Sequence, residues 1–199
     1  SPLASLKKLR HLSINQNRTI VDISPLAGMT EMRYLDISSN EIADISPLSE
    51  MINLEFLNAI FNPIQDIQPL FSMKKLKMLY LSNANIAGNC YGINELKELS
   101  LLWLCACGIT DISVLKDMTN LSNLSLEFNS IADISVLENL LNLSAVYLYK
   151  NNISDITPLV RNPGIGEGDF ITLSGNPLSD ESINIHIPTL KARGVNVSY

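Results

Sequence analysis

The chain repeats itself every 22 or 23 residues, and this period constrains the fold more than any single motif. Each unit opens with a leucine or a methionine and continues with apolar residues at matching positions. A unit of this length cannot bury its own apolar side, so consecutive units have to stack and share one core. The opening residues are Leu6, Met29, Met51, Met73, Leu96, Met118 and Leu140.

Each unit contains a strand signal followed by a turn signal. In the second unit, Leu35 and Ile37 alternate with polar residues, which is the period of a half-buried strand. Residues 44–48, Asp-Ile-Ser-Pro-Leu, predict a tight turn into a short 3₁₀-like segment. Proline is accepted at a first helical position, and the serine before it can act as a cap. One unit is therefore a strand, a turn and a short return segment.

The pattern of apolar positions followed by Asn and by Asp-Ile-x-Pro-Leu resembles the leucine-rich repeat family, specifically the 22-residue class found in internalins and protein phosphatase regulators. The resemblance covers Leu3 to about Tyr199. It implies an α/β solenoid of about eight repeats, a horseshoe with a parallel concave β-sheet and short 3₁₀ or irregular segments on the convex side. The concave side is the usual ligand-binding side in this family.

The two ends and the fourth unit depart from the regular pattern. Residues 1–161 are expected to form the repeats and residues 162–199 the last repeat and a C-terminal cap, which resembles bacterial examples. In the cap, Ser179 should begin a helix that Pro188 interrupts, and residues 195–199 should form a closing edge strand. Ser1 stands in mid-repeat, so we expect further sequence upstream.

The fourth unit lacks the Asp turn and has one extra residue, and we expect Cys90 and Tyr91 to project there as a secondary contact.

Two polar positions recur after the strand of each unit. The first is asparagine, whose buried carboxamide can serve backbone groups that stacking leaves unpaired; Ala84 and Cys107 replace it in two units. The second is aspartate, which either accepts hydrogen bonds from its own turn or lines up with its neighbours as a calcium site. The turn is favoured, because the Asp-x-Asp spacing of a calcium loop is missing. The positions are Asn17, Asn40, Asn62, Asn129, Asn151, Asn176 and Asp22, Asp44, Asp66, Asp111, Asp133, Asp155.

Composition and residue placement argue against several function classes. The formal net charge of −6 speaks against nucleic-acid and anionic-lipid partners, and no apolar run reaches the ~18 residues of a membrane span. His11 and His186 stand at opposite ends of the predicted solenoid, so we expect no enzyme, no cofactor and no metal site. Cys105 and Cys107 are too close on one strand to pair comfortably, and a thiol site with Cys90 is the less favoured alternative. Free cysteines favour a reducing compartment without excluding export.

The outward-facing residues of the predicted strands form three rows on the concave face. The first row starts with His11, Tyr34 and Phe56, the second with Ser13, Asp36 and Asn58, and the third with Asn15, Ser38 and Ile60. These rows contain the single tryptophan and four of the six tyrosines, and exposed aromatic clusters of this kind mark binding sites. The alternative is that neighbouring aromatic residues stack to stabilise the sheet. The low charge of the rows predicts weak salt dependence of binding. The candidate ligand-binding residues are Tyr34, Asp36, Phe56, Asn58, Ile60, Met78, Tyr80, Leu101, Trp103, Cys105, Glu127, Tyr147 and Tyr149, with Trp103 and Tyr80 as central anchors and Asp36 and Glu127 selecting register.

The sequence therefore predicts a non-catalytic module that binds a protein ligand through an aromatic-rich concave face, as a monomer. The resemblance to exported bacterial repeats favours an extracellular or cell-surface location in a bacterium. Two alternatives remain at this point: an intracellular regulatory subunit of another enzyme, for which the free cysteines speak, and structural spacer repeats in a larger surface protein.

Overall fold

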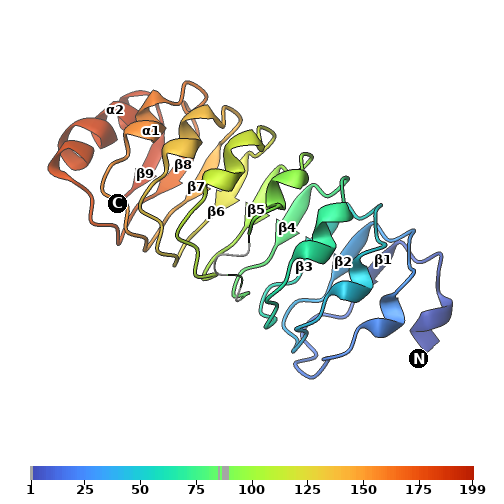
Figure 1. Ribbon diagram of the computed structural model, residues 1–199. Helices are drawn as coiled ribbons and strands as arrows, with labels where there is room; N and C mark the ends of the chain where they lie inside the picture. The colour runs from blue at the N-terminus through green and yellow to red at the C-terminus, as the bar shows by residue number, and fades with distance from the viewer. Residues whose placement is uncertain (1, 85, 87–89) are drawn as a thin grey trace.

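A computed structural model describes residues 2–84, 86 and 90–199. The chain forms a single stack of coils with the strands along one side and short helical segments along the other (Figure 1). Nine strands pair in parallel in the order of the sequence, as one sheet. The strands are β1 (His11–Ser13), β2 (Tyr34–Asp36), β3 (Phe56–Asn58), β4 (Met78–Tyr80), β5 (Leu101–Trp103), β6 (Asn123–Ser125), β7 (Ala145–Tyr147), β8 (Phe170–Thr172) and β9 (Asn196–Ser198). The predicted solenoid with a parallel sheet is confirmed.

The return segments are short helical turns on the side opposite the sheet, as the repeat pattern predicts. Those from η1 to η7 are 3₁₀ turns, and the one that follows β7 is α-helical. None of the described helices is long and apolar enough to cross a bilayer. The helical segments, with those of the C-terminal cap last, are η1 (Pro2–Ser5), η2 (Ser24–Leu26), η3 (Ser46–Leu48), η4 (Gln68–Ser72), η5 (Ile93–Glu95), η6 (Ser113–Asp117), η7 (Ser135–Asn139), α1 (Thr157–Arg161), η8 (Ser182–His186) and α2 (Ile187–Ala192).

The core runs through the centre of the stack. In each of the three-residue strands β2 to β8 the middle residue points inward and is buried, as Leu57 is in β3 and Leu102 in β5, while most of their neighbours stay partly exposed. Leucine, isoleucine and methionine side chains from consecutive coils form one continuous apolar cluster. Because each coil buries its apolar side only against the next, stability comes from stacking.

The predicted asparagine ladder lies beneath the turns that follow most of the strands, but Asn17 at its first position is exposed and not buried as expected, because no preceding coil covers it. The Nδ2 of Asn62 donates to the Ile37 carbonyl of the preceding coil at 2.9 Å, and its Oδ1 accepts from the Ile42 amide at 3.0 Å. Where the asparagine is replaced by Cys107, the thiol lies 3.5 Å from the Leu81 carbonyl and takes over the donor role. The ladder thus pairs backbone groups between coils that the sheet does not reach.

The aspartate at the next turn has the structural role that the sequence favoured. Asp44 Oδ1 accepts the backbone N–H of Ser46 at 2.8 Å, and the corresponding aspartates accept a backbone N–H in the same way in five other units. The prediction that the serine caps the 3₁₀ segment is wrong. The residue at the cap position is isoleucine, as Ile45 is in η3, and it makes no side-chain cap bond. Serine occupies the first helical position, where its free N–H needs the aspartate.

The C-terminal residues form helical segments and a last strand. Ser179 Oγ accepts the Ser182 amide at 3.1 Å, and β9 closes the sheet parallel to β8. The chain stays helical through Pro188 instead of being interrupted. Residues Ser182–His186 adopt a π turn, so Pro188 lies directly after the point where the helix changes from π to α.

Two expectations fall partly or wholly on residues outside the described ranges. Ser1, taken as evidence for further sequence upstream, is one of them, and so is part of the irregular fourth unit, residues 85 and 87–89. Of the pair expected to project there, Tyr91 is 68% exposed and Cys90 is buried. Only the tyrosine is therefore available as a contact.

Candidate functional site

The register of the sheet sets the three predicted rows side by side. Tyr34 lies between His11 and Phe56, and Trp103 between Tyr80 and Ser125, as direct partners across neighbouring strands. We call the outward side of β1–β8 the concave face. Trp103 and Tyr80 flank the buried middle residues of their strands and are themselves partly exposed. The two anchors therefore lie on the concave face and not inside the coil.

Five rings on strands β1–β5 of the concave face form a continuous aromatic chain. Tyr34 and Phe56 stack with centroids 4.2 Å apart and an interplanar angle of 8°. The chain then crosses rows from Phe56 to Tyr80 at 5.5 Å and meets Trp103 edge-on at 5.0 Å. His11 extends it at the other end, 6.1 Å from Tyr34. Such ring contacts are worth about 0.5–1.5 kcal/mol each beyond buried area, so the rings stabilise the sheet while still offering exposed area.

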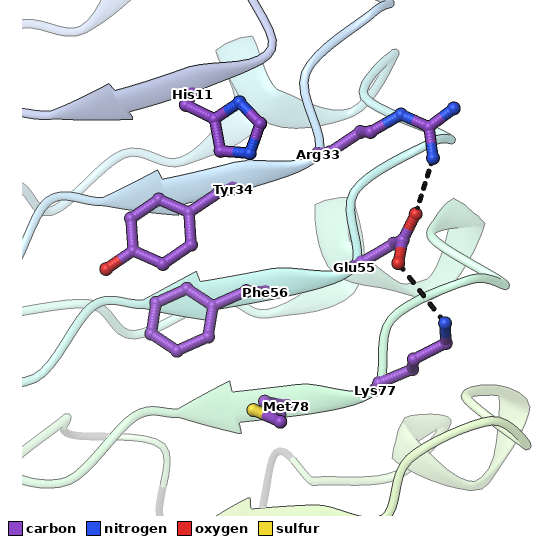
Figure 2. A pocket seen from close by; sticks show the side chains of 7 residues that line it. All are labelled: His11, Arg33, Tyr34, Glu55, Phe56, Lys77 and Met78. Atoms are coloured by element: carbon purple, nitrogen blue, oxygen red, sulfur yellow. Dashed lines mark hydrogen bonds and ion pairs between the residues drawn. The ribbon is translucent and has the colours of Figure 1, made fainter.

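A shallow depression of about 400 Å³ lies at the start of this chain. Its floor is formed by His11, Tyr34, Phe56 and Met78, and Met78 is 41% exposed. Its rim is formed by three charged side chains that precede the strands, Arg33, Glu55 and Lys77, and Figure 2 shows them beside the rings. Leu101 continues the apolar row on β5, where it is partly buried.

The rim residues form an ion-paired row. Glu55 Oε1 accepts from Arg33 Nη1 at 2.7 Å, and its Oε2 accepts from Lys77 Nζ at 3.2 Å (Figure 2). The hydrogen bond from Lys77, more than that from Arg33, holds the pKa of the Glu55 carboxyl below its ordinary value. The row thus has two cations for one carboxylate.

The polar candidates of the rows are largely occupied within the protein. Asp36 is 7% exposed, and its carboxylate accepts from Asn15 Nδ2 at 3.0 Å and from Ser38 Oγ at 2.7 Å. Asn58 Oδ1 accepts the Ile60 amide at 3.2 Å. Asp36 and Asn58 therefore support the turns after β2 and β3, and little of Asp36 is left for a partner.

The thiol of Cys105 is also engaged within the concave face. It lies 2.9 Å from Ser125 Oγ and 3.7 Å from the carboxylate of Glu127, which stays partly exposed. The three cysteines are free. Burial raises the pKa of the Cys107 thiol to about 11, and it also raises the pKa of Cys90. At neutral pH these two thiols are therefore protonated and unreactive.

A second aromatic group lies at the other end of the concave face. Tyr147 contacts Phe170 at 5.7 Å, and Tyr149 meets Phe128 edge-on at 5.1 Å. The Nζ of Lys150 lies 5.2 Å from the Phe128 ring centre and 5.3 Å from that of Tyr149. The polar strand β6 separates this group from the five-ring chain, so the candidate residues form two patches.

Sequence reasoning missed two sets of residues next to the rows. One is the charged row before the strands, which could have been found by reading the residue that precedes each strand in every unit. The other is Phe128, 50% exposed, in the turn after β6. The sequence could have indicated it, because most units have a small or polar residue at the position of Phe128.

The two histidines of the chain lie far apart. His11 lies in β1 and His186 in η8, at the two ends of the stack. Within the described ranges, no three His, Cys, Asp or Glu side chains lie close enough to share a metal ion. The arrangement offers aromatic and apolar surface with flanking charges, which suits the binding of a macromolecule.

Comparisons with known proteins agree with this fold. A family model described as leucine-rich repeats (two copies) matches residues 7–50. An internalin (inlF) from Listeria monocytogenes has a TM-score of 0.82 and 28% identity, over 99% of this chain and 62% of that one. Internalin C2 (inlC2) of the same organism has a TM-score of 0.81 and 26% identity, over 99% of this chain and 82% of that one.

A more distant structure shows the same fold. A leucine-rich repeat protein from Leptospira interrogans has a TM-score of 0.85 at 18% identity, over 99% of this chain and 56% of that one. No curated protein sequence matches the chain. The chain spans less than two thirds of the inlF and Leptospira structures, so the activities of such longer proteins are not carried over to it.

Proposed function

We propose, from the premise that the chain is a leucine-rich repeat protein with structural similarity to Listeria internalins, that it is a non-catalytic module that binds a protein ligand on its concave face. The observation that supports this most is the five-ring chain from His11 to Trp103. It lies on partly exposed strand positions where β6 has Asn123 and Ser125, so large rings are not required there for the sheet to form.

The size and chemistry of the face fit a protein ligand. Eight strands ~4.8 Å apart make a wall ~35–40 Å long, which is enough for a standard protein interface. Tyrosine and tryptophan in the middle of such a wall are the residue types that dominate binding energy. We assign Trp103 and Tyr80 as anchors, with Tyr34, Phe56 and Met78 around them. The polar side chains that are hydrogen-bonded within the protein, such as Asp36, stabilise the turns after the strands and do not contact the ligand.

Similarity to internalins supports a bacterial cell-surface or secreted location, and we propose a monomer. The three free cysteines support the alternative of an intracellular regulatory subunit, because a reducing compartment keeps thiols unpaired. Since both alternatives use the same concave face, a binding experiment on that face does not depend on where the protein resides.

The test replaces the two anchors by residues that the chain itself has at the same strand position, Tyr80→Asn to match Asn58 and Trp103→Ser to match Ser125. Peptides are selected from a random 12-residue phage-displayed library against the immobilised wild type, and the affinity of the enriched peptides is then measured. We expect the double variant to keep its cooperative thermal unfolding and to lose about tenfold or more in affinity, since such anchors are worth ~1.4 kcal/mol or more.

The matched control removes two exposed apolar side chains outside the rows, Ile52→Ala and Leu141→Ala. This variant should bind the enriched peptides as well as the wild type does. If the anchor variant and the control bind alike, or if the anchor variant fails to fold while single-site variants of Tyr80 and Trp103 bind normally, the rings are structural and the proposal fails.

A further inference from the structure

The charges along one edge of the sheet are strongly divided between the two halves of the molecule. We call the residues one and three positions before each strand the leading edge. Along β1–β4 it has five cations and two carboxylates, and along β5–β8 it has three carboxylates and no cation. These residues are Lys8, Arg10, Glu31, Arg33, Glu55, Lys75 and Lys77 in the first half, and Glu98, Glu167 and Asp169 in the second. A net charge of +3 therefore lies on a protein whose total is −6.

The positive half of the leading edge is one continuous structure. The amide of Arg33 donates to the Arg10 carbonyl, that of Glu55 to the Arg33 carbonyl, and that of Lys77 to the Glu55 carbonyl, each at 2.8–2.9 Å. The side chains that precede β1–β4 are therefore held at the spacing of the strands. Each of them starts from a fixed backbone position next to the concave face.

The cations of this edge keep most of their donors available. Arg33 has five N–H groups and Lys77 has three, and each makes one side-chain bond, to Glu55. Their side chains are 51% and 55% exposed. Glu55 sits between them and shows by its own bonds that one carboxylate can bridge the cation before β2 and the cation before β4 (Figure 2).

The same cations border the apolar floor of the depression. Tyr34, Phe56 and Met78 each follow directly after a leading-edge residue and point onto the concave face. A chain that lies along this boundary would meet rings on one side and cations on the other. The ligand that fits both is a segment in which apolar side chains stand next to carboxylates.

We propose that the ligand-contacting region of the partner is an acidic protein segment, with Asp or Glu side chains against Arg33 and Lys77 and apolar side chains on the Tyr34–Phe56–Met78 floor. This inference rests on the proposed function, since it uses the same concave face. The division of charge also decides where on the face this segment binds, because the acidic leading edge of β5–β8 repels its carboxylates. The acidic segment therefore lies over β1–β4.

A nucleic acid is the other polyanion that combines charge with flat apolar groups. The overall charge of −6 and the acidic second half of the leading edge repel a phosphate backbone that would extend along the face. A short acidic peptide needs only the positive half. The observations therefore favour protein, and an oligonucleotide serves as the contrary probe.

The test uses the 12-residue phage-displayed library with three proteins: the wild type, the double variant Arg33→Gln with Lys77→Gln, and the anchor variant Tyr80→Asn with Trp103→Ser. We expect peptides enriched by the wild type to contain Asp or Glu beside aromatic or aliphatic residues. The Arg33/Lys77 variant should bind them about tenfold more weakly at ~50 mM salt and about twofold more weakly at ~500 mM salt, because exposed charges are screened. This expectation replaces the weak salt dependence inferred from the three rows alone.

The matched control removes one arginine and one lysine from the convex side, Arg161→Gln in α1 with Lys116→Gln in η6. It should bind the enriched peptides as the wild type does. Equal loss in the control and the Arg33/Lys77 variant would mean that only overall charge matters, and the proposal would be wrong.

The remaining outcomes separate this inference from the proposed function. Peptides that need Tyr80 and Trp103 but have no excess of acids, or bind the Arg33/Lys77 variant normally, leave the protein-binding function standing and overturn the acidic segment. A labelled 12-nucleotide single-stranded RNA that binds the wild type more tightly than any enriched peptide, and loses affinity in the Arg33/Lys77 variant, overturns it in favour of nucleic acid. If no peptide is enriched by the wild type, both proposals fail.

Discussion

At the scale of single residues, the residue directly before each asparagine-ladder position has a left-handed backbone conformation, which most residues other than glycine avoid. The φ angle there is positive in every unit, between 52° and 78°, because the chain has to turn sharply from the strand into the stack. Only the last unit uses glycine, so the other units carry left-handed strain of ~1–3 kcal/mol each. These residues are Gln16, Ser39, Phe61, Asn83, Ala106, Phe128, Lys150 and Gly175.

Ala106 offers a direct test of this strain. Its φ is 52° and its side chain is exposed, so Ala106→Gly should remove strain without removing a contact. We expect the free energy of unfolding to rise by ~0.5–1 kcal/mol in urea titrations. The same substitution at Ala145, in the regular strand β7, should lower it by a similar amount. A loss of stability in both variants would show that the turn is not strained.

At the scale of the repeat element, the aspartate turn links each strand to its return segment. Hydrogen bonds from the backbone and side chain of the residue two positions on lower the pKa of Asp22, Asp44, Asp111 and Asp155 in the folded protein. In the first three the largest cause is the serine N–H, and in Asp155 it is the Thr157 hydroxyl. The ionised carboxylate therefore stabilises the turn in four units at once.

This gives stability a defined pH dependence. A carboxyl whose folded pKa is lowered stabilises the protein fully above its unfolded pKa, about 3.9, and loses that contribution as the pH falls through the lower folded value. We expect the thermal midpoint to fall below pH ~4 and to fall less in Asp44→Asn, which keeps an acceptor but has no charge. Equal slopes for wild type and variant between pH ~4 and ~2 would contradict this role.

At the scale of the whole molecule, the stack depends on covering its last apolar layer. The C-terminal helix α2 places Ile187 and Leu190 over the final coils, and both are buried. Repeat proteins of this kind need such a cap to stay soluble, since an open end presents apolar surface and unpaired strand edges.

Leu190→Asp should therefore destabilise the end of the stack by several kcal/mol and promote aggregation, because it buries a charge without a partner. The exposed neighbour Ala192→Asp introduces the same charge on the same helix and should have little effect. Size-exclusion chromatography together with thermal unfolding distinguishes them. A monomeric Leu190→Asp variant with an unchanged midpoint would show that the cap is dispensable.

Much of the fold could be predicted because a repeat multiplies every signal. A single Leu-x-Ile alternation is weak evidence for a strand, but the same pattern in seven units at a constant period specifies a parallel stack. The period also decides which residue faces which, so the spacing alone is enough to place His11, Tyr34 and Phe56 side by side. The capping serine and the break at Pro188 were wrong, since both depend on local hydrogen bonds that the repeat does not specify.

The sequence by itself determined the solenoid, the register of its strands and the set of side chains on the concave face, because identical coils can stack in only one way that buries all their apolar positions. Only the tertiary structure decided how those side chains meet. Phe56 contacts Tyr80, which belongs to a different row. The carboxylate of Asp36 accepts hydrogen bonds from Asn15 and Ser38. Arg33 and Lys77 both form ion pairs with Glu55. These contacts depend on side-chain torsions and on reach between neighbouring coils, which a one-dimensional period does not contain.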